Sequence, residues 1–487
     1  MGYKPTKGEC SDFSGIGKSF QRNFLLFVEF SPRLAALLGP AWGNSHGAQA
    51  LFPVMRSLEE ERFAQVEPMT TQGTSNEPIV ITGIGLVTSL GNDREAVWRA
   101  IQAGRSNVRP LRGLRGLPDD YLFGATVDVP LAVPGQLKVI PLCQMAAREA
   151  MQDSSIDLNQ VDMTRFGSAI AGHMGDTRWL GGGITAAEAE TGANWWEQFL
   201  PSTASTLVAN EFGLLGPRVS HSTACASSLI SILTAMRRIR DGQCDVMLTG
   251  GGDSIDPLFA AGFHRMGVLA KHSDPNQACR PFDRCRNGFV MGEGAAMFVV
   301  ERLSHALKRG ARIYAELVSG AILAEAHHVT GLDMESETLT QLIRQTLAKG
   351  SVEPQDIGYI NAHGTGTTQN DLVEMRSIRQ ALGSAADQVS VSASKSMIGH
   401  LVNAAGGVEL AITVLAQRDG YCPPTINLND LDPACTLDCV PLIGKQVNFE
   451  YAVKLSVAFG GHLVAVLLRR WNDAATGFAY PSERKAA

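Results

Sequence analysis

The 487-residue sequence has no apolar run long enough to cross a membrane. A membrane helix needs about 20 consecutive apolar residues, whereas the most apolar stretch, residues 24–39, is interrupted by Glu29, Pro32 and Arg33. The same charges make this stretch a poor signal peptide, because the core of a signal peptide is apolar. We therefore expect a protein in solution, in the cytoplasm, without membrane insertion.

A disulfide framework and a metal-binding pattern are also missing. The nine cysteines are odd in number and contain no Cys-x-x-Cys pair, which favours reduced thiols over a disulfide scaffold. The spacings from Cys279 to Cys285 and from Cys435 to Cys439 are not accompanied by paired histidines. No metal site is therefore predicted.

Long runs of Lys and Arg do not occur, and the formal net charge is −6. The overall electrostatics therefore give no case for a nucleic-acid partner, although a local basic patch for an acidic carrier protein stays compatible with this charge. Hydrophobic residues make up 45% of the chain and charged residues 18%. Such a chain can bury large cores, and its length indicates two or three domains.

The first 77 residues lack the sustained periodicity of the rest. We expect residues 1–77 to form a poorly ordered extension. A targeting peptide is one alternative, although Glu9 and Asp12 are unusual in such peptides. Translation upstream of a true start at Met69 is another, in which case residues 1–68 do not belong to the native protein.

From Pro78 onward, short β-rich runs such as "CDVMLTGGGD" alternate with helical patterns such as "DLVEMRSIRQAL". This alternation predicts an α/β fold with buried sheets. A charged helical pattern followed by a new strand pattern places a boundary near Gly310. The prediction is an N-terminal half over residues 78–310, a C-terminal half over residues 311–470, and a tail over residues 471–487.

Cys225 lies in "HSTACASSLISI", a run of small residues that precedes a helical pattern. The apolar residues that follow are spaced by three and four and so share one helix face: Leu229, Ile232, Leu233, Met236 and Ile239. Cys225 is then expected in the first turn, where free backbone N–H groups and the helix dipole lower the pKa of a thiol. The alternative is a small buried core residue.

Two histidines and a lysine lie further along the chain. His363 ends a strand-like run in "NAHGTGTTQND", whose glycines and threonines suit a tight polar loop. Lys395 and His400 precede a small-residue helix containing Glu409, in "SASKSMIGHLVNAAGGVEL". Taken singly, each is compatible with a surface charge or a packing residue.

The ordered set is more specific than its members. Cys225 is followed by "HGTGT", "KSMIGH" and "AFGGH", and residues 280–301 read "RPFDRCRNGFVMGEGAAMFVVE". From about Pro78 to Arg470 the chain resembles the elongating β-ketoacyl-acyl carrier protein synthases of the thiolase superfamily. The resemblance implies a thiolase-like fold with two similar α/β halves in a five-layer αβαβα arrangement, and a homodimer. It also implies substrates delivered on the phosphopantetheine of an acyl carrier protein, with no bound cofactor.

The activity that the resemblance implies is that of a β-ketoacyl-[acyl-carrier-protein] synthase. This acyltransferase joins a malonyl unit to an enzyme-bound acyl chain by decarboxylative Claisen condensation, in fatty acid or polyketide biosynthesis. By resemblance, Cys225 would hold the acyl chain, and the backbone N–H groups of Cys225 and Phe459 would form the oxyanion hole. His363 and His400 would donate hydrogen bonds to the malonyl thioester carbonyl.

The same resemblance gives supporting roles to six further residues. They are Lys395 for tuning the histidines, Glu409 for bracing that lysine, Thr365 and Thr367 for holding the phosphopantetheine arm, and Asp371 and Glu374 for supporting the loop.

The chain departs from the family pattern near its C-terminal end. The family reads "GFGGTN" where this chain reads "AFGGH", so Ala458 replaces a glycine and His462 a threonine. Because alanine adopts positive φ less readily than glycine, we hypothesise a stiffer gate. One alternative function is a non-catalytic partner subunit resembling a chain-length factor, but such subunits lack the cysteine. A cysteine hydrolase is another, and it would leave Lys395 and one histidine without a role.

Overall fold

The computed structural model describes residues 77–114, 117, 122–132, 136–172, 198 and 200–472. The described residues belong to one compact unit. The predicted N-terminal extension up to residue 76, the alternative start at Met69 and the tail beyond residue 472 lie outside the described residues. Among the residues described, no helix combines the length and the apolar character that crossing a membrane requires.

The strands and helices alternate along the chain. The strands are β1 (Ile79–Thr88), β2 (Arg109–Pro110), β3 (Phe123–Ala125), β4 (Phe166–Ala171), β5 (Arg218–Val219), β6 (Val246–Asp253), β7 (Met291–Gly292), β8 (Gly294–Arg302), β9 (Ala315–Ala324), β10 (Ile357–Asn361), β11 (Ser390–Ser392), β12 (Tyr421–Cys422), β13 (Lys445–Gln446), β14 (Tyr451–Ala458) and β15 (His462–Arg470). The helices are α4 (Arg94–Gln102), α5 (Val139–Ser154), α6 (Thr203–Glu211), α7 (Ser227–Arg240), α8 (Pro257–Met266), α9 (Leu303–Lys308), α10 (Thr338–Gly350), α11 (Thr368–Leu382), α12 (Lys395–Ile398) and α13 (Ala405–Asp419).

One large sheet runs through the described residues, with ten strands in the order β11-β10-β14-β15-β9-β1-β8-β6-β4-β5. Strand β1 joins its two parts, because it pairs antiparallel with β8 on one side and with β9 on the other. The strands before Gly310 in the sequence fill one part of the sheet, and the strands after it fill the other. β1 is buried at all ten residues, as expected for a strand covered on both faces.

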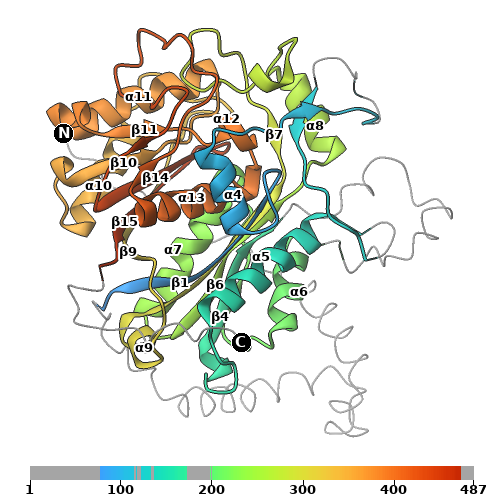
Figure 1. Ribbon diagram of the computed structural model, residues 1–487, viewed down its shortest axis with the longest axis vertical. Coiled ribbons are helices and arrows are strands. Elements are labelled where there is room, and N and C mark those ends of the chain that lie inside the picture. Colours follow the sequence, from blue (N-terminus) through green and yellow to red (C-terminus); the bar gives the residue numbers. More distant parts are fainter. Residues whose placement is uncertain are drawn as a thin grey trace, which may run out of the picture. The chain divides into compact units, whose positions relative to one another are not determined.

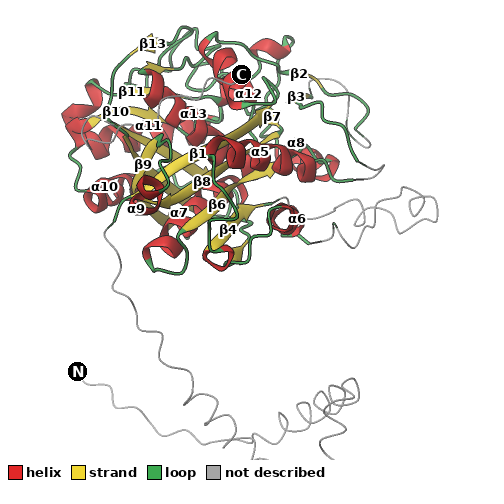
Figure 2. Ribbon diagram, turned by 60° about the horizontal axis from the view of Figure 1, so that its bottom comes forward, coloured by secondary structure: helices red, strands yellow, loops and turns green. Residues whose placement is uncertain are grey.

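Helices cover the outer faces of the sheet and also lie between its two parts (Figures 1 and 2). Helices α5 and α6 pack on the strands that precede Gly310, whereas α10, with α11 beside it, packs on the strands that follow. Helices α7 and α13 contact each other and strands of both parts. The described residues thus form the predicted five-layer αβαβα arrangement, with separate hydrophobic cores on either side of the middle helices.

Helix α13 is central to this arrangement. Every residue from Ala405 to Gln417 is buried, which is typical of a helix enclosed by a protein core. Small residues let it approach α7 closely: a Cβ on Gly406 would lie 2.6 Å from Cγ of Leu229. This close approach brings the residues of α13 near Cys225, which directly precedes α7.

We predict that Gly406→Ala lowers the free energy of unfolding by about 1–3 kcal/mol, because the added methyl group overlaps Leu229 in a packed core. Chemical denaturation of the purified protein measures this change. The matched control is Gly262→Ala in α8, where a Cβ would meet no atom within 4 Å. Helix propensity should leave the stability of that control unchanged or raise it by up to about 1 kcal/mol. Equal stability of the two variants would contradict the packing argument.

Candidate active site

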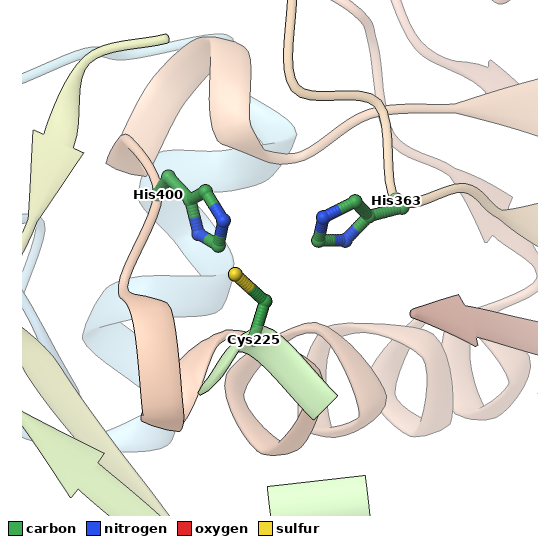
Figure 3. Close-up of side chains that lie close together, drawn as sticks. All are labelled: Cys225, His363 and His400. Carbon is green, nitrogen blue, oxygen red and sulfur yellow. The ribbon is translucent and has the colours of Figure 1, made fainter. Parts of the chain in front are cut away.

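Cys225 lies in a 3₁₀ turn, Ala224–Ala226, just ahead of α7 rather than inside its first turn. Its sulfur points toward the rings of His363 and His400 (Figure 3). Ala224, the residue before the cysteine, has a φ of 47°. A left-handed conformation is costly for a residue with a Cβ, and such strain is concentrated at functional sites. The turn therefore presents the thiol instead of packing it into the helix.

His363 and His400 approach the thiol from two different loops. His363 follows β10, and His400 follows α12. Their rings meet edge to face, with centroids 5.2 Å apart and an interplanar angle of 84°. One atom from each of the three residues, the sulfur and two ring nitrogens, lies within 4.8 Å of the others, and all three residues are buried. Segments far apart in the sequence thus converge on one point.

Hydrogen bonds determine which ring nitrogen carries the proton. Nζ of Lys395 lies 3.2 Å from Nδ1 of His363. The backbone N–H of Val402 donates to Nδ1 of His400 at 3.2 Å. Because a protonated amine and a backbone N–H only donate, both Nδ1 atoms must accept, and each neutral ring carries its proton on Nε2. Both histidines therefore have an Nε2–H group available as a donor.

Lys395 is the first residue of α12 and is fully buried. Its Nζ donates to the backbone carbonyl of His363 and pairs with Oε1 of Glu409, each at 2.5 Å. Glu409 comes from the middle of α13 and is buried as well. Since a buried ammonium is tolerated only with such partners, the ion pair fixes the positive charge beside His363.

The electrostatic surroundings keep both imidazoles neutral. Burial, and after it the positive charge of Lys395, holds the pKa of His363 well below its usual 6.5. The same two causes, in the same order, hold the pKa of His400 well below 6.5. Removal from water and a nearby cation both disfavour the imidazolium form. At physiological pH the two rings are therefore neutral hydrogen-bond donors.

The prediction that the Cys225 thiol has a lowered pKa is wrong for this structure. Burial raises its pKa to about 12, against the opposing effects of Lys395 and of the backbone N–H groups of Cys225 and Phe459. The loss of hydration of a thiolate outweighs the helix terminus. The resting residue is therefore a thiol. The oxyanion hole formed by the backbone N–H groups of Cys225 and Phe459 stays a prediction, since such a hole must reach the carbonyl oxygen of a bound substrate.

Two carboxylates of α11 hold the loop that carries His363. Glu374 accepts from the backbone N–H groups of His363 and Gly364 at 2.5 and 2.8 Å. Asp371 accepts from the N–H groups of Thr365 and of the next residue at 3.1 and 3.2 Å. Burial raises the pKa of both carboxyl groups, to about 7 for Glu374. Both side chains contact the loop's main chain, a position that suits a supporting role.

A cavity of about 270 Å³ is lined by Cys225 and by both histidines. Thr365 and Thr367 also line it, and their hydroxyl oxygens lie 2.9 Å apart. The cavity thus combines the thiol and the two ring donors with hydroxyl groups that can bond to the amides of a substrate arm.

A second cavity, of about 440 Å³, shares Cys225, Phe263 and Phe459 with the first. Its other walls are largely apolar and include Ile255, Leu258, Phe259, Met266, Met291 and Val402. Cys225 therefore borders two spaces of different character. An apolar group bonded to its sulfur would leave water by entering the second one.

Phe459 belongs to the turn between β14 and β15. Gly460 and Gly461 take the positive φ values of this turn, 84° and 75°. Ala458 ends β14 and pairs with His462, the first residue of β15. Ala458 itself does not have a positive φ. The alanine is thus accommodated without strain in this conformation, and the stiffer gate stays a prediction about opening.

One buried charge at the site was not predicted from the sequence. Lys454 of β14 is fully buried, and its Nζ lies 2.6 Å from Oε2 of Glu409. The available signal was a lysine within the otherwise apolar run "YAVKLSVAF". Because charged residues are almost never fully buried unless they are paired, that lysine predicts a buried acidic partner.

The sulfur and two ring nitrogens are also close enough together to hold a metal ion, and Cys and His are common zinc ligands. The ammonium of Lys395 next to His363 and that of Lys454 next to Glu409 oppose the entry of a cation. The absence of a metal therefore stays our prediction.

Comparison of this chain with known protein families and proteins points to one family. Residues 76–141 and 138–306 match the beta-ketoacyl synthase N-terminal domain, and residues 314–429 match the beta-ketoacyl synthase C-terminal domain. The chain is 36% identical over 409 residues to 3-oxoacyl-[acyl-carrier-protein] synthase 2 of Coxiella burnetii, which covers 81% of this chain and 99% of that protein. It is 37% identical over 411 residues to the actinorhodin polyketide putative beta-ketoacyl synthase 1 of Streptomyces coelicolor, with 80% and 88% covered.

A solved structure supports the same conclusion. The chain is similar to a chain in the structure of a type II PKS acyl-carrier protein in complex with its ketosynthase bound to the hexaketide. The TM-score is 0.75 and the identity 30%, over 81% of this chain and 100% of that chain. The fold, the converging cysteine and histidines and these relatives agree. The chain therefore belongs to the beta-ketoacyl synthase family and is a condensing acyltransferase of fatty acid or polyketide biosynthesis.

Proposed function

We propose that Cys225 takes an acyl chain from the phosphopantetheine of an acyl carrier protein, and that His363 and His400 then promote the decarboxylation of a malonyl unit on a second carrier. One observation carries this proposal: the sulfur of Cys225 and a ring nitrogen of each histidine lie within 4.8 Å of one another. One nucleophile with two N–H donors meets the needs of a decarboxylative condensation. A non-catalytic partner subunit would have no use for this convergence.

The first step exchanges one thioester for another. The sulfur of Cys225 bonds to the acyl carbonyl carbon, the bond from that carbon to the phosphopantetheine sulfur breaks, and the thiol proton of Cys225 passes to the departing sulfur. The backbone N–H groups of Cys225 and Phe459 stabilise the oxyanion that forms on the carbonyl oxygen. Because the thiol has a pKa of about 12 at rest, its proton leaves only as the carbonyl carbon is attacked.

The second step joins the two chains. Loss of carbon dioxide from the malonyl group leaves negative charge on the thioester oxygen, where the Nε2–H groups of His363 and His400 donate hydrogen bonds. The enolate carbon then attacks the acyl carbonyl, the bond to the sulfur of Cys225 breaks, and the released thiolate takes a proton from solvent to restore the thiol. Lys395, held by Glu409, lies against Nδ1 of His363 and so strengthens the donor character of the Nε2–H group on the same ring.

The two cavities suit the two parts of the substrate. Thr365 and Thr367 line the first cavity and would bind the amides of the phosphopantetheine arm. The second cavity, apolar and bordered by Phe459, would hold the acyl chain. Asp371 and Glu374 support this assignment indirectly, because they position the backbone of the loop.

The proposal includes the partners. The substrates would arrive on a separate acyl carrier protein, in line with the solved ketosynthase and carrier protein complex to which this chain is similar. We further propose that the enzyme acts in the cytoplasm as a homodimer and binds no cofactor of its own. Sedimentation analysis of the purified chain tests the dimer.

Intact-protein mass spectrometry tests the proposed reaction. The protein is incubated with acyl carriers of graded chain length, and malonyl carrier is then added. We expect an acyl adduct on Cys225 that disappears while a chain extended by the malonyl-derived carbons forms on the carrier. No adduct with any chain length would overturn the proposal in favour of a non-catalytic partner subunit.

We predict that Cys225→Ala abolishes the adduct and lowers condensation roughly 10⁴-fold or more, because the nucleophile is lost. The variant should still release carbon dioxide from malonyl carrier, since both histidine donors remain. Cys285→Ala is the matched control, because Cys285 is an exposed free thiol, and it should keep full activity. Acylation of the Cys225→Ala variant would show that another residue is the nucleophile.

We also predict that Gly262→Leu shortens the accepted chain, because Gly262 lines the apolar cavity and a side chain there meets open space. The kcat/KM for long acyl carriers should fall by about 10- to 100-fold, with little change for short ones. Gly262→Ala should give a smaller shift in the same direction. An unchanged chain-length profile in both variants would place the acyl chain elsewhere.

A further inference from the structure

Lys454 makes three contacts inside the protein, and none of the steps described above uses it. Its Nζ lies 2.6 Å from Oε2 of Glu409. It also donates to the backbone carbonyls of Ala362 and Asn361, at 3.0 and 3.4 Å. Lys395 pairs with the other oxygen of the same carboxylate, Oε1, at 2.5 Å. Two fully buried lysines therefore share one glutamate.

These contacts hold the main chain that carries His363 from both directions. Asn361 and Ala362 immediately precede His363, and their carbonyls accept from Lys454. On the N–H side, Glu374 accepts from His363 and from the residue after it. A cation of β14 and an anion of α11 thus anchor the same short segment. This segment sets the position of the His363 side chain. Lys395 holds the segment as well, because its Nζ donates to the carbonyl of His363.

The charges around Lys454 come from every neighbouring element. The positive groups are Lys395 of α12 and Arg286 of the segment before β7; the negative groups are Glu409 of α13, Glu374 and Asp371 of α11, and Asp432, which pairs with Arg286 at 2.6 Å; the neutral titratable groups are His363, His400 and Tyr359. Each cation in this set therefore has an acidic partner. A folded protein keeps such a buried set at a cost in desolvation, which favours a functional reason for it.

We propose that Lys454 is a positioning residue for His363. Its ammonium binds the carbonyls of the two residues before His363 and pairs with Oε2 of Glu409. Oε1 of Glu409 is then left for Lys395, which keeps the Lys395 ammonium beside Nδ1 of His363. This proposal rests on the role given to His363 above. The Lys454 ammonium does not reach the substrate cavity lining, so it acts through the histidine. On this proposal Lys454 raises the rate of decarboxylation but not that of acyl transfer, which uses Cys225 and the oxyanion hole.

The pH dependence follows from the signs of the shifts. Burial raises the pKa of Glu374 to about 7, and the positive charge of Lys454 opposes that rise. Without Lys454 the pKa of Glu374 is higher still. A protonated Glu374 carboxyl accepts less well from the N–H of His363. The fall in rate on the acidic side of the pH profile, its acid limb, therefore moves to higher pH. Burial lowers the pKa of Lys454 itself to about 8. Wild-type decarboxylation should therefore decline as Lys454 loses its proton above that pH.

The experiment measures carbon dioxide release from malonyl carrier between about pH 6 and pH 9.5. Lys454→Met keeps the length of the side chain and removes its charge. We expect kcat to fall by about tenfold at pH 7.5, KM to stay within about twofold, the acid limb to shift upward, and the alkaline limb to disappear. Acylation of Cys225 should keep its wild-type rate. Lys445→Met, an exposed lysine paired with Asp438, is the matched control and should show the wild-type profile.

Lys454→Arg keeps the proposal testable if the methionine variant does not fold. Its charge does not titrate in this range, so the acid limb should match wild type and the alkaline limb should move above that of wild type. A wild-type profile in Lys454→Met, or an equal loss of rate at every pH, would overturn the positioning role. If wild type itself released no carbon dioxide, the proposed function would fail, and this proposal with it; normal wild-type release with unaffected Lys454 variants would overturn this proposal alone.

Discussion

The chemistry of this protein depends on neutralising positive charge where water is excluded. Lys395 and Lys454 are fully buried, and Glu409 lies between them with one oxygen for each ammonium. An unpaired ammonium in such a place costs several kcal/mol, so each lysine needs the glutamate. The pairing fixes Lys395 against His363, and burial together with that charge keeps His363 and His400 neutral. Neutral rings with a proton on Nε2 are the donors that a decarboxylation requires.

The layered fold explains how these residues meet. Glu409 can lie between the two lysines because α13 is enclosed on all sides and packs through Gly406 against α7, next to the turn that carries Cys225. His363 and Lys395 approach from the ends of β10 and β11, while Lys454 and Phe459 come from within β14 and the turn after it. The two parts of the sheet each supply residues, so neither half of the chain contains the whole site. Phe459 borders both cavities, so it lies between the space proposed for the substrate arm and the space proposed for the acyl chain.

Much of this could be predicted from the sequence, and the limits have physical causes. Periodicity gave the α/β class and the helix after Cys225, whereas the layer order came only from resemblance, because strand pairing between distant segments leaves no local pattern. The motifs placed Cys225, His363, Lys395 and His400 in order, but spacing could not show that they converge. The thiol pKa was predicted in the wrong direction because a helix terminus is visible in sequence and burial is not. Lys454 was missed although a lysine in an apolar strand indicates a buried acidic partner, because the sequence does not show which acidic residue, here Glu409, lies beside it.

Nuclear magnetic resonance of protein labelled with ¹⁵N-histidine tests the central claim most directly, with His363→Asn and His400→Asn assigning the two signals. The nitrogen shifts report both the charge of each ring and the nitrogen that carries its proton. Between about pH 6 and pH 8, both rings should stay neutral with the proton on Nε2, because burial and Lys395 hold their pKa values well below 6.5. If either ring titrates near its usual pKa, or if His363 carries its proton on Nδ1, the buried lysine and glutamate pairing does not control the site in the way described.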